Sequence, residues 1–277
     1  MDVKTAFLYP TLREEVFMAI PEGHSEYSDM PCPDGTFPVL RLLKALYGLK
    51  QAPRAWYEDL NRFFTSVGMT WSSEDHSLYF SHNPIILLYV DHLLLFSQDL
   101  WNIAMMKKRL ATAYHITDFG PIRQFLGLNI VRDRTLHRIE LHQSPYIQTI
   151  LTRFDMSDCK GISTPMEPNL SLPPCTNDTE IKDRSEYQLK IGSIMFAMLG
   201  TRPDLAYTVS ALSKHNDRPT HPHHIALQRV FHYLQQTQVT CIQYERSPSE
   251  LGVFPKVTGY TDSDWAGDET DRRSTSG

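Results

Sequence analysis

The 277-residue sequence has little of what marks secreted, membrane or zinc-finger proteins. Its four cysteines are scattered and none forms a Cys-x-x-Cys pair, so neither a zinc finger nor a disulfide framework is expected. No apolar signal segment follows Met1. The longest apolar run, "PIILLYVDHLLLF", is interrupted by Asp91 and His92 and is too short to cross a bilayer. These absences predict a protein of the cytoplasm or nucleus with no membrane partner.

The sequence also has no excess of positive charge. Its formal net charge is −5, which argues against a protein that coats nucleic acid with its whole surface. Basic side chains are nevertheless concentrated in residues 37–62, which include Lys50 and Arg54. A local basic groove is therefore compatible with the acidic total. Taken alone, Lys50 and Arg54 fit a solvated helix start better than a binding surface.

What the sequence does have is a regular apolar pattern. Hydrophobic residues make up 41% of the chain, which is enough for a packed core. The pattern predicts a strand at residues 1–9, an irregular loop at 21–38, a helix after Pro53, a strand meander around residues 77–97, and a helix capped by Asp99. A second hairpin should follow at "FLGLNIVRD" and "HRIELHQ", and then a helix with Ser144 as its N-cap.

The second half of the chain has a different pattern. Prolines interrupt residues 157–184, which predicts a linker. Helices are expected at about 185–199, 203–215 and 221–237, before the pattern returns to strands. This order predicts an α+β first domain and an α-helical second one.

Two aspartates in the first half suggest a metal site. "LYVDHLLLF" predicts a hairpin with Asp91 at its tip, and Asp2 lies on the first strand. If the two strands are neighbours, both carboxylates could hold Mg²⁺ in a two-metal nucleotidyl transfer site, because Mg²⁺ prefers oxygen ligands. Spacing alone leaves simpler interpretations open. An aspartate at a two-residue turn is usually there because its side chain favours the turn conformation, and Asp2 could be a solvated residue at the chain end.

The order of several motifs favours the metal site. "MDVKTAFL", "LYGLKQAPRAWY", "LYVDHLLLF" and "DFGPIRQFLGLNI" follow one another, and "GSIMFAMLGTRPDLAYTVSALSKH" and "GYTDSDWAGDETDRRSTSG" come later. In this order they resemble the reverse transcriptase of copia-type LTR retrotransposons over nearly the whole chain. The resemblance implies an RNA-directed DNA polymerase fold of the α+β class, with a palm made of an antiparallel sheet and helices. A helical thumb or connection region and the first strands of an RNase H-like unit would follow.

The resemblance also implies domain boundaries. Residues 1–156 match a palm with a primer-gripping hairpin, and residues 157–184 match a linker. Residues 185–255 match the helical thumb or connection region, and residues 256–277 match a truncated start of the RNase H-like domain. The chain begins at the first catalytic strand, so the fingers segment is expected to be missing.

Site residues follow from the same resemblance. Asp2 matches the first palm carboxylate, Asp91 the first aspartate of the Tyr-x-Asp-Asp hairpin, and Tyr89 the tyrosine of that motif. Asp262 matches the first carboxylate of the RNase H domain. The remaining matches are in the loop and helix that pack against template and nucleotide and in the primer-gripping hairpin: Gly48, Lys50, Gln51 and Pro53, and Phe125, Leu126 and Gly127.

His92 departs from the family pattern, because it stands where the second aspartate of the hairpin is expected. The imidazole is a poor Mg²⁺ ligand and adds no negative charge. The expected cofactor is therefore Mg²⁺ in the intact family, with doubtful binding here. The expected partners are an RNA template, a DNA primer or RNA–DNA hybrid, and other parts of a retrotransposon polyprotein. The resulting hypothesis is a polymerase fragment that is inactive. The alternatives are an enzyme that acts with fingers from another polypeptide, and a non-enzymatic remnant that binds nucleic acid or protein.

Overall fold

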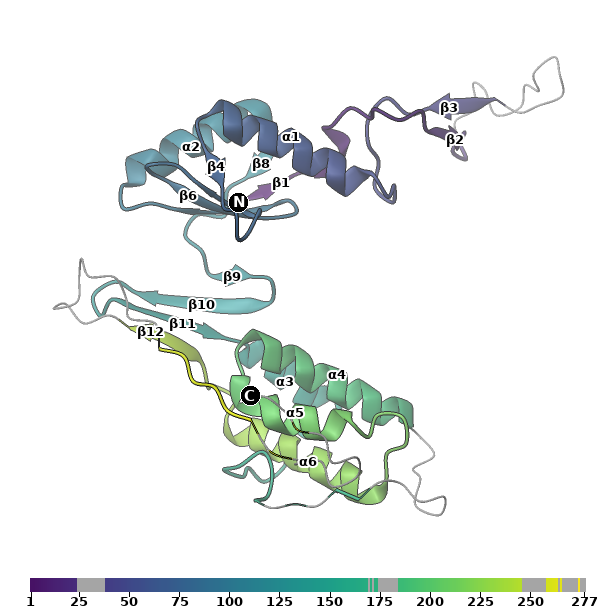
Figure 1. The fold of residues 1–277 in the computed structure, drawn as a ribbon, viewed down its shortest axis with the longest axis vertical. Helices are drawn as coiled ribbons and strands as arrows, with labels where there is room; N and C mark the ends of the chain where they lie inside the picture. The colour runs from purple at the N-terminus through teal and green to yellow at the C-terminus, as the bar shows by residue number, and fades with distance from the viewer. Residues whose placement is uncertain are drawn as a thin grey trace. The chain divides into compact units, whose positions relative to one another are not determined.

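The computed structural model divides the chain into two compact units, Met1–Ile122 and Arg123–Gly277 (Figure 1). The structure describes residues 1–23, 38–168, 170, 172–173, 184–245, 258–263, 265 and 274.

The first unit contains a six-stranded antiparallel sheet. Its spatial order is β4 (Thr70–Trp71), β5 (Leu78–Phe80), β6 (Ile85–Tyr89), β7 (His92–Phe96), β1 (Asp2–Val3) and β8 (Ile116–Thr117). The predicted meander is confirmed as β5–β6–β7. The strand predicted for residues 1–9 is confirmed only at β1 and is wrong beyond it. Thr5 has a φ of 52°, which ends the strand, and a 3₁₀ helix follows at Ala6–Leu8.

Two helices cover one face of this sheet, α1 (Ala52–Ser66) and α2 (Leu100–Ala113) (Figure 1). Both were predicted. Trp56, Leu60 and Phe64 are buried at spacings of four residues, which places them on one helical face against the strands. Asp99 caps α2 by accepting a hydrogen bond from the backbone N–H of Trp101 at 2.8 Å. The open face of the sheet therefore lies on the side away from both helices.

A separate two-stranded ribbon is formed by β2 (Phe17–Ala19) and β3 (Val39–Arg41). The sequence did not indicate these strands. Most of the loop predicted at 21–38 lies outside the described residues.

The second unit combines a four-stranded sheet with helices. Its sheet order is β12 (Ile242–Glu245), β11 (Arg138–His142), β10 (Leu128–Asp133) and β9 (Gln124–Phe125). The helical elements are α3 (Ser144–Arg153), α4 (Arg184–Gly200), the 3₁₀ turn η2 (Pro203–Leu205), α5 (Ala206–Ser213) and α6 (His221–Gln236). The second hairpin and the three predicted helices are confirmed. The predicted N-cap at Ser144 is wrong by one residue, since Gln143 occupies that position without a side-chain cap.

The unit boundary after Ile122 places the β10–β11 hairpin in the same unit as the helices, and within this unit β11 pairs with β12. Within the predicted linker, residues 157–168 form neither helix nor strand. None of the helices in the described part of the chain has the length and apolar character needed to span a bilayer.

Candidate metal centre

The register of the central strands places Asp2 beside His92. The two residues are directly opposed across the β1–β7 pair. The Val3 N–H donates to the Asp91 carbonyl and the Leu93 N–H to the Met1 carbonyl, both at 2.9 Å. The ladder bonds therefore flank the opposed pair, which makes it a non-hydrogen-bonded pair. In such pairs the Cα atoms approach to about 4.5 Å and the side chains lie closest together.

The face on which this pair lies is also determined by the register. Val3 and Leu93 are buried against the helices. Successive side chains alternate along a strand, so Asp2 and His92 point to the open face. Tyr89 is paired with His92 across the hairpin and lies on the same face, where its side chain is exposed. The predicted Asp2, Tyr89 and His92 positions are thus adjacent on the open face of one sheet.

Asp91 completes the cluster from the hairpin turn. The Nδ1 atom of His92 lies 3.2 Å from an Asp2 carboxylate oxygen, and its Nε2 atom lies 4.0 Å from an Asp91 carboxylate oxygen. The imidazole thus lies between the two acids. One ligand atom from each of the three residues can be chosen so that all lie within 4.8 Å of one another. All three side chains are partly exposed, which leaves room for water or a further ligand.

The backbone of the turn is held from two sides. The indole N–H of Trp56 donates to the Val90 carbonyl at 2.6 Å, and the Val3 N–H donates to the Asp91 carbonyl. Val90 has a φ of 54°, a conformation that glycine adopts without strain and valine does not. Strain of this kind persists where the surroundings determine the backbone. Here those surroundings are α1 on one side and β1 on the other.

A cavity of about 300 Å³ lies beside the hairpin tip. Its wall is largely apolar and includes Trp56, Leu88, Tyr89 and Val90. Pro53, one of the predicted template- and nucleotide-contacting residues, also lines it. Phe7, His76 and Ser77 contribute to the same wall and were not predicted as site residues.

The loop before α1 contains the other predicted residues of this group. Gly48 has a φ of 94°, which explains why glycine is suited to the turn. Gln51 is the N-cap of α1 and makes no side-chain cap, while Pro53 occupies the first turn of the helix. Lys50 is exposed and forms no ion pair with any residue that the structure describes.

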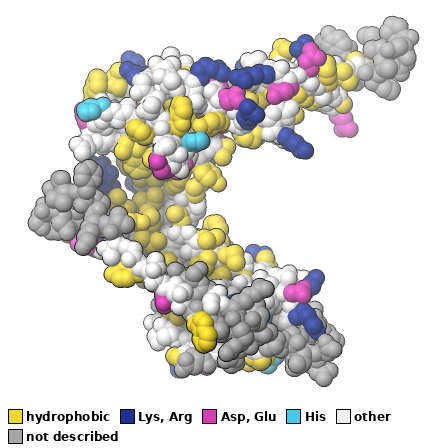
Figure 2. Space-filling model, viewed as in Figure 1, with side chains coloured by type: hydrophobic (Ala, Val, Ile, Leu, Met, Phe, Trp, Pro, Cys, Tyr) yellow, Lys and Arg dark blue, Asp and Glu magenta, His cyan; other side chains and the backbone are white. Residues whose placement is uncertain are grey.

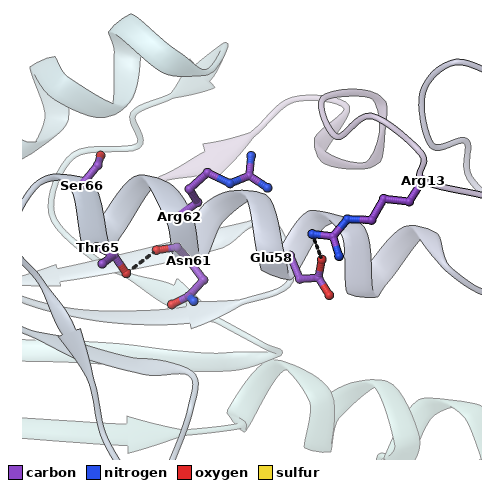
Figure 3. Close-up of a pocket in the computed structure, with 6 residues that line it drawn as sticks. All are labelled: Arg13, Glu58, Asn61, Arg62, Thr65 and Ser66. Atoms are coloured by element: carbon purple, nitrogen blue, oxygen red, sulfur yellow. Dashed lines mark hydrogen bonds and ion pairs between the residues drawn. The ribbon is translucent and has the colours of Figure 1, made fainter.

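Three arginines of the basic segment, Arg41, Arg54 and Arg62, pair with neighbouring acids. Arg54 and Arg13 both pair with Glu58 at 3.0 Å, and Arg62 pairs with Asp59 at 3.2 Å. Figure 2 shows basic and acidic side chains interspersed in this region. A second cavity, of about 580 Å³, lies along α1, with Arg13 and Glu58 at one end and Ser66 at the other (Figure 3). The predicted basic groove is therefore a surface of mixed charge.

The remaining predicted residues lie in the second unit. Leu126 and Gly127 form a two-residue turn between β9 and β10, and both have positive φ values, 49° and 81°. A side chain added at Gly127 would contact the ring of Phe196 on α4 at 3.5 Å, so the turn lies against that helix. Phe125 ends β9. Their role in gripping a primer stays a prediction.

Asp262 is exposed, and its carboxylate accepts a hydrogen bond from the Ser263 backbone N–H at 2.8 Å. Most of residues 256–277 lie outside the described residues. The assignment of an RNase H unit to this segment therefore stays a prediction.

Trp56 is the residue at this site whose role the sequence did not indicate. Its helical spacing predicts a core residue, and its ring is indeed buried. The hydrogen bond to Val90 spans 34 positions and depends on where the indole nitrogen points, which no local pattern encodes.

Comparison with known proteins identifies the family to which the chain belongs. The family model described as reverse transcriptase (RNA-dependent DNA polymerase) matches residues 1–168. The retrovirus-related Pol polyprotein from transposon TNT 1-94 of Nicotiana tabacum is 37% identical over the whole chain. The polyprotein from transposon RE1 of Arabidopsis thaliana is 34% identical, also over the whole chain. A transposon Ty5-1 protein of Saccharomyces cerevisiae is 34% identical over 91% of this chain and 80% of its own length.

The chain spans about a fifth of the two polyproteins, 21% of the first and 18% of the second. No solved structure matches it. The family match covers well over half of the chain and includes every residue of the Asp2–Asp91–His92 cluster. The chain therefore belongs to the reverse transcriptase (RNA-dependent DNA polymerase) family and is homologous to the Pol polyproteins of copia-type retrotransposons.

Proposed function

We propose that this chain is a palm-and-thumb part of a copia-type reverse transcriptase that does not support Mg²⁺-dependent DNA synthesis. In the proposal Asp2 and Asp91 are the remaining catalytic carboxylates, and His92 occupies the position of the third. Tyr89 lies near the primer end, and the loop and helix start with Gly48, Lys50, Gln51 and Pro53 pack against the template and the incoming nucleotide. RNA template and DNA primer are the partners that the family implies.

One observation carries this proposal: the imidazole of His92 lies 3.2 Å from the Asp2 carboxylate, in the non-hydrogen-bonded pair that brings side chains closest. The family uses Mg²⁺, which prefers oxygen ligands in octahedral geometry. The cluster offers two carboxylates with a nitrogen heterocycle between them. This donor set does not fit a pair of Mg²⁺ ions. Losing one acid from a charge-stabilising site costs roughly 10³-fold in rate.

Primer extension on an RNA template in Mg²⁺ tests the proposal. The wild-type chain should extend the primer no faster than the Asp91→Asn variant. The His92→Asp variant restores the third carboxylate and should extend it roughly 10³-fold faster than wild type. His82→Asp is the matched control, because His82 is an exposed histidine of the same unit that lies outside the cluster. Wild-type extension as fast as that of His92→Asp would contradict the proposal.

The non-enzymatic alternative, binding through the basic loop, has less support. Four arginines of the first unit, at positions 13, 41, 54 and 62, are already paired with acids. These pairs offset part of the positive charge that would attract phosphates, although Arg13 and Arg54 share one acid, Glu58.

A further inference from the structure

The mismatch between the cluster and Mg²⁺ points to a different ion. We propose that Asp2, Asp91 and His92 form a site for one divalent transition-metal ion of the zinc class, with His92 as a direct ligand. This proposal concerns which ion the residues hold, and it does not depend on whether the chain retains or has lost polymerase activity.

The donor chemistry supports a transition metal. Imidazole is a common ligand of Zn²⁺, Co²⁺ and Ni²⁺, and these ions also accept carboxylate oxygen. Three protein ligands and an open position are typical of zinc sites that also bind water or substrate. Mg²⁺ is a small, hard cation that prefers oxygen donors in octahedral geometry, so an imidazole in place of a carboxylate weakens its binding.

The distances also suit one ion. Two ligands of a tetrahedral Zn²⁺ lie about 3.4 Å apart when each is about 2.1 Å from the ion. The Asp2 oxygen and the His92 Nδ1 atom are 3.2 Å apart. The Asp91 ligand atom lies within the 4.8 Å that encloses the set, and its side chain is partly exposed on the turn. Binding of one ion by all three residues therefore requires the Asp91 carboxylate to move closer to the other two ligand atoms.

The backbone that carries the three ligands is fixed before any ion arrives. Asp2 and His92 are opposed across the ladder, and Asp91 adjoins Val90, whose carbonyl is bonded to Trp56. A scaffold that is already ordered loses less conformational entropy on binding, which raises affinity. Among the described residues this is the one group of three or more histidine, cysteine, aspartate or glutamate side chains with ligand atoms this close.

The first experiment uses the full chain without a polyhistidine tag. Co²⁺ is titrated while its visible absorption is recorded, and Zn²⁺ binding is measured by calorimetry. We expect one ion per chain and a Co²⁺ spectrum of four- or five-coordinate type with nitrogen ligation. Zn²⁺ should displace Co²⁺, and a large excess of Mg²⁺ should not.

Variants then assign the ligand. His92→Ala should weaken Zn²⁺ binding at least about 100-fold, since removing residues that merely support a ligand already costs 10- to 100-fold. His82→Ala, the matched control, should bind as wild type does. His92→Asp should also lose Zn²⁺ affinity and should let Mg²⁺ compete with Co²⁺. Circular dichroism on each variant shows that the fold is retained, and the opposite effects of His92→Asp on the two ions separate ligand loss from unfolding.

Two results would overturn the proposal. One is the absence of a one-to-one Co²⁺ or Zn²⁺ site in wild type, which would mean that the imidazole only interacts with the neighbouring carboxylates and holds no ion. The other is Zn²⁺ binding that His92→Ala leaves unchanged, which would place the ion elsewhere. Metal titration and primer extension are separate measurements, so failure of the metal proposal can be told apart from failure of the proposed loss of Mg²⁺-dependent synthesis.

Discussion

Trp56 donates its indole N–H to the carbonyl oxygen of Val90, 34 residues away, at 2.6 Å. This bond connects the helix that covers the sheet to the turn that carries Asp91. Trp56 also packs edge-on against Tyr114, with ring centroids 5.3 Å apart, so its ring is fixed by an aromatic cluster as well as by the hydrogen bond. The position of the hairpin tip is thus determined by the core of the first unit.

Replacing Trp56 with phenylalanine should loosen the tip. The variant keeps an aromatic ring but removes the hydrogen bond and some buried volume, so the free energy of unfolding of the first unit should fall by about 2 kcal/mol. Urea denaturation measures this change, and amide hydrogen exchange at Asp91 and His92 should accelerate. Trp71→Phe is the control. Trp71 is 43% exposed, and the change there should stay within about 0.5 kcal/mol. Unchanged exchange at the tip in Trp56→Phe would contradict the structural role of the bond.

Replacing Val90 with glycine should stabilise the first unit. The positive φ of Val90 costs about 1–2 kcal/mol for a side chain with Cβ, and glycine removes that cost. Glycine also adds freedom to the unfolded chain, which offsets about 0.5–1 kcal/mol. Val90 is 48% exposed, so little apolar burial is lost. A net gain of roughly 0.5–1 kcal/mol should appear in urea denaturation. Val90→Ala retains the Cβ and should show no gain, and destabilisation by glycine would argue against strain at this turn.

In the second unit, Asp204 should stabilise the fold by providing the counter-charge of the buried Arg202. The side chain of Arg202 is 1% exposed, and its Nη2 atom lies 2.8 Å from the Asp204 carboxylate. Burial alone would raise the pKa of Asp204, but hydrogen bonds from Arg202 and Tyr233 lower it overall. Asp204→Asn leaves a buried cation without a counter-charge, so the free energy of unfolding should fall by about 3 kcal/mol.

Thermal denaturation measures the effect of Asp204→Asn, and an exposed ion pair of the same unit supplies its control. Asp217 pairs with Arg184 at 3.3 Å and its side chain is 87% exposed, so Asp217→Asn should cost less than about 0.5 kcal/mol. Equal losses in the two variants would show that burial of Arg202 carries no penalty. The double variant Arg202→Met/Asp204→Asn should recover part of the lost stability, since it removes the buried charge altogether.

The elements of both units could be predicted from the sequence wherever an apolar period was long. The 3.6-residue period of α1 and the alternation in β6 and β7 each depend on which face is buried, and this information is local. The predicted strand at residues 1–9 was wrong beyond Val3 because Thr5 adopts a left-handed conformation, which nothing in its neighbours signals. The short β2–β3 ribbon was not predicted, because strands of three residues are too short to show a recognisable alternation of apolar and polar side chains.

The candidate site was predicted less by spacing than by resemblance. Asp2 and Asp91 are 89 positions apart, and only the β1–β7 register brings their strands together. His92 was predicted as a departure from the family pattern, but its place between both carboxylates follows from the pairing of β1 with β7 and not from any local pattern. The strain at Val90 and the bond from Trp56 could not be predicted either, because both arise from tertiary packing.

His223 should make the second unit sensitive to acid. The "HPHH" segment begins α6, and the Thr220 backbone N–H donates to the Nδ1 atom of His223 at 2.9 Å, as part of a capping box. The ring is buried and stacks on His215, with centroids 3.7 Å apart. Burial and the nearby charge of His215 lower the pKa of His223 to about 4. The unfolded chain, in which this pKa is about 6.5, therefore binds more protons between these two values.

Because the folded pKa is the lower one, the stabilisation is complete above about pH 6.5 and is lost as the pH falls towards 4. The loss attributable to His223 should approach about 3 kcal/mol. His223→Gln is the informative variant, since glutamine at this position of a capping box can accept the same backbone hydrogen bond and does not titrate. Urea denaturation at pH 7, 5.5 and 4.5 should show a steep fall in stability for wild type and a shallower one for His223→Gln. His221→Gln, at an exposed position of the same helix start, should keep the wild-type slope. Parallel pH profiles for wild type and His223→Gln would mean that other groups cause the acid sensitivity.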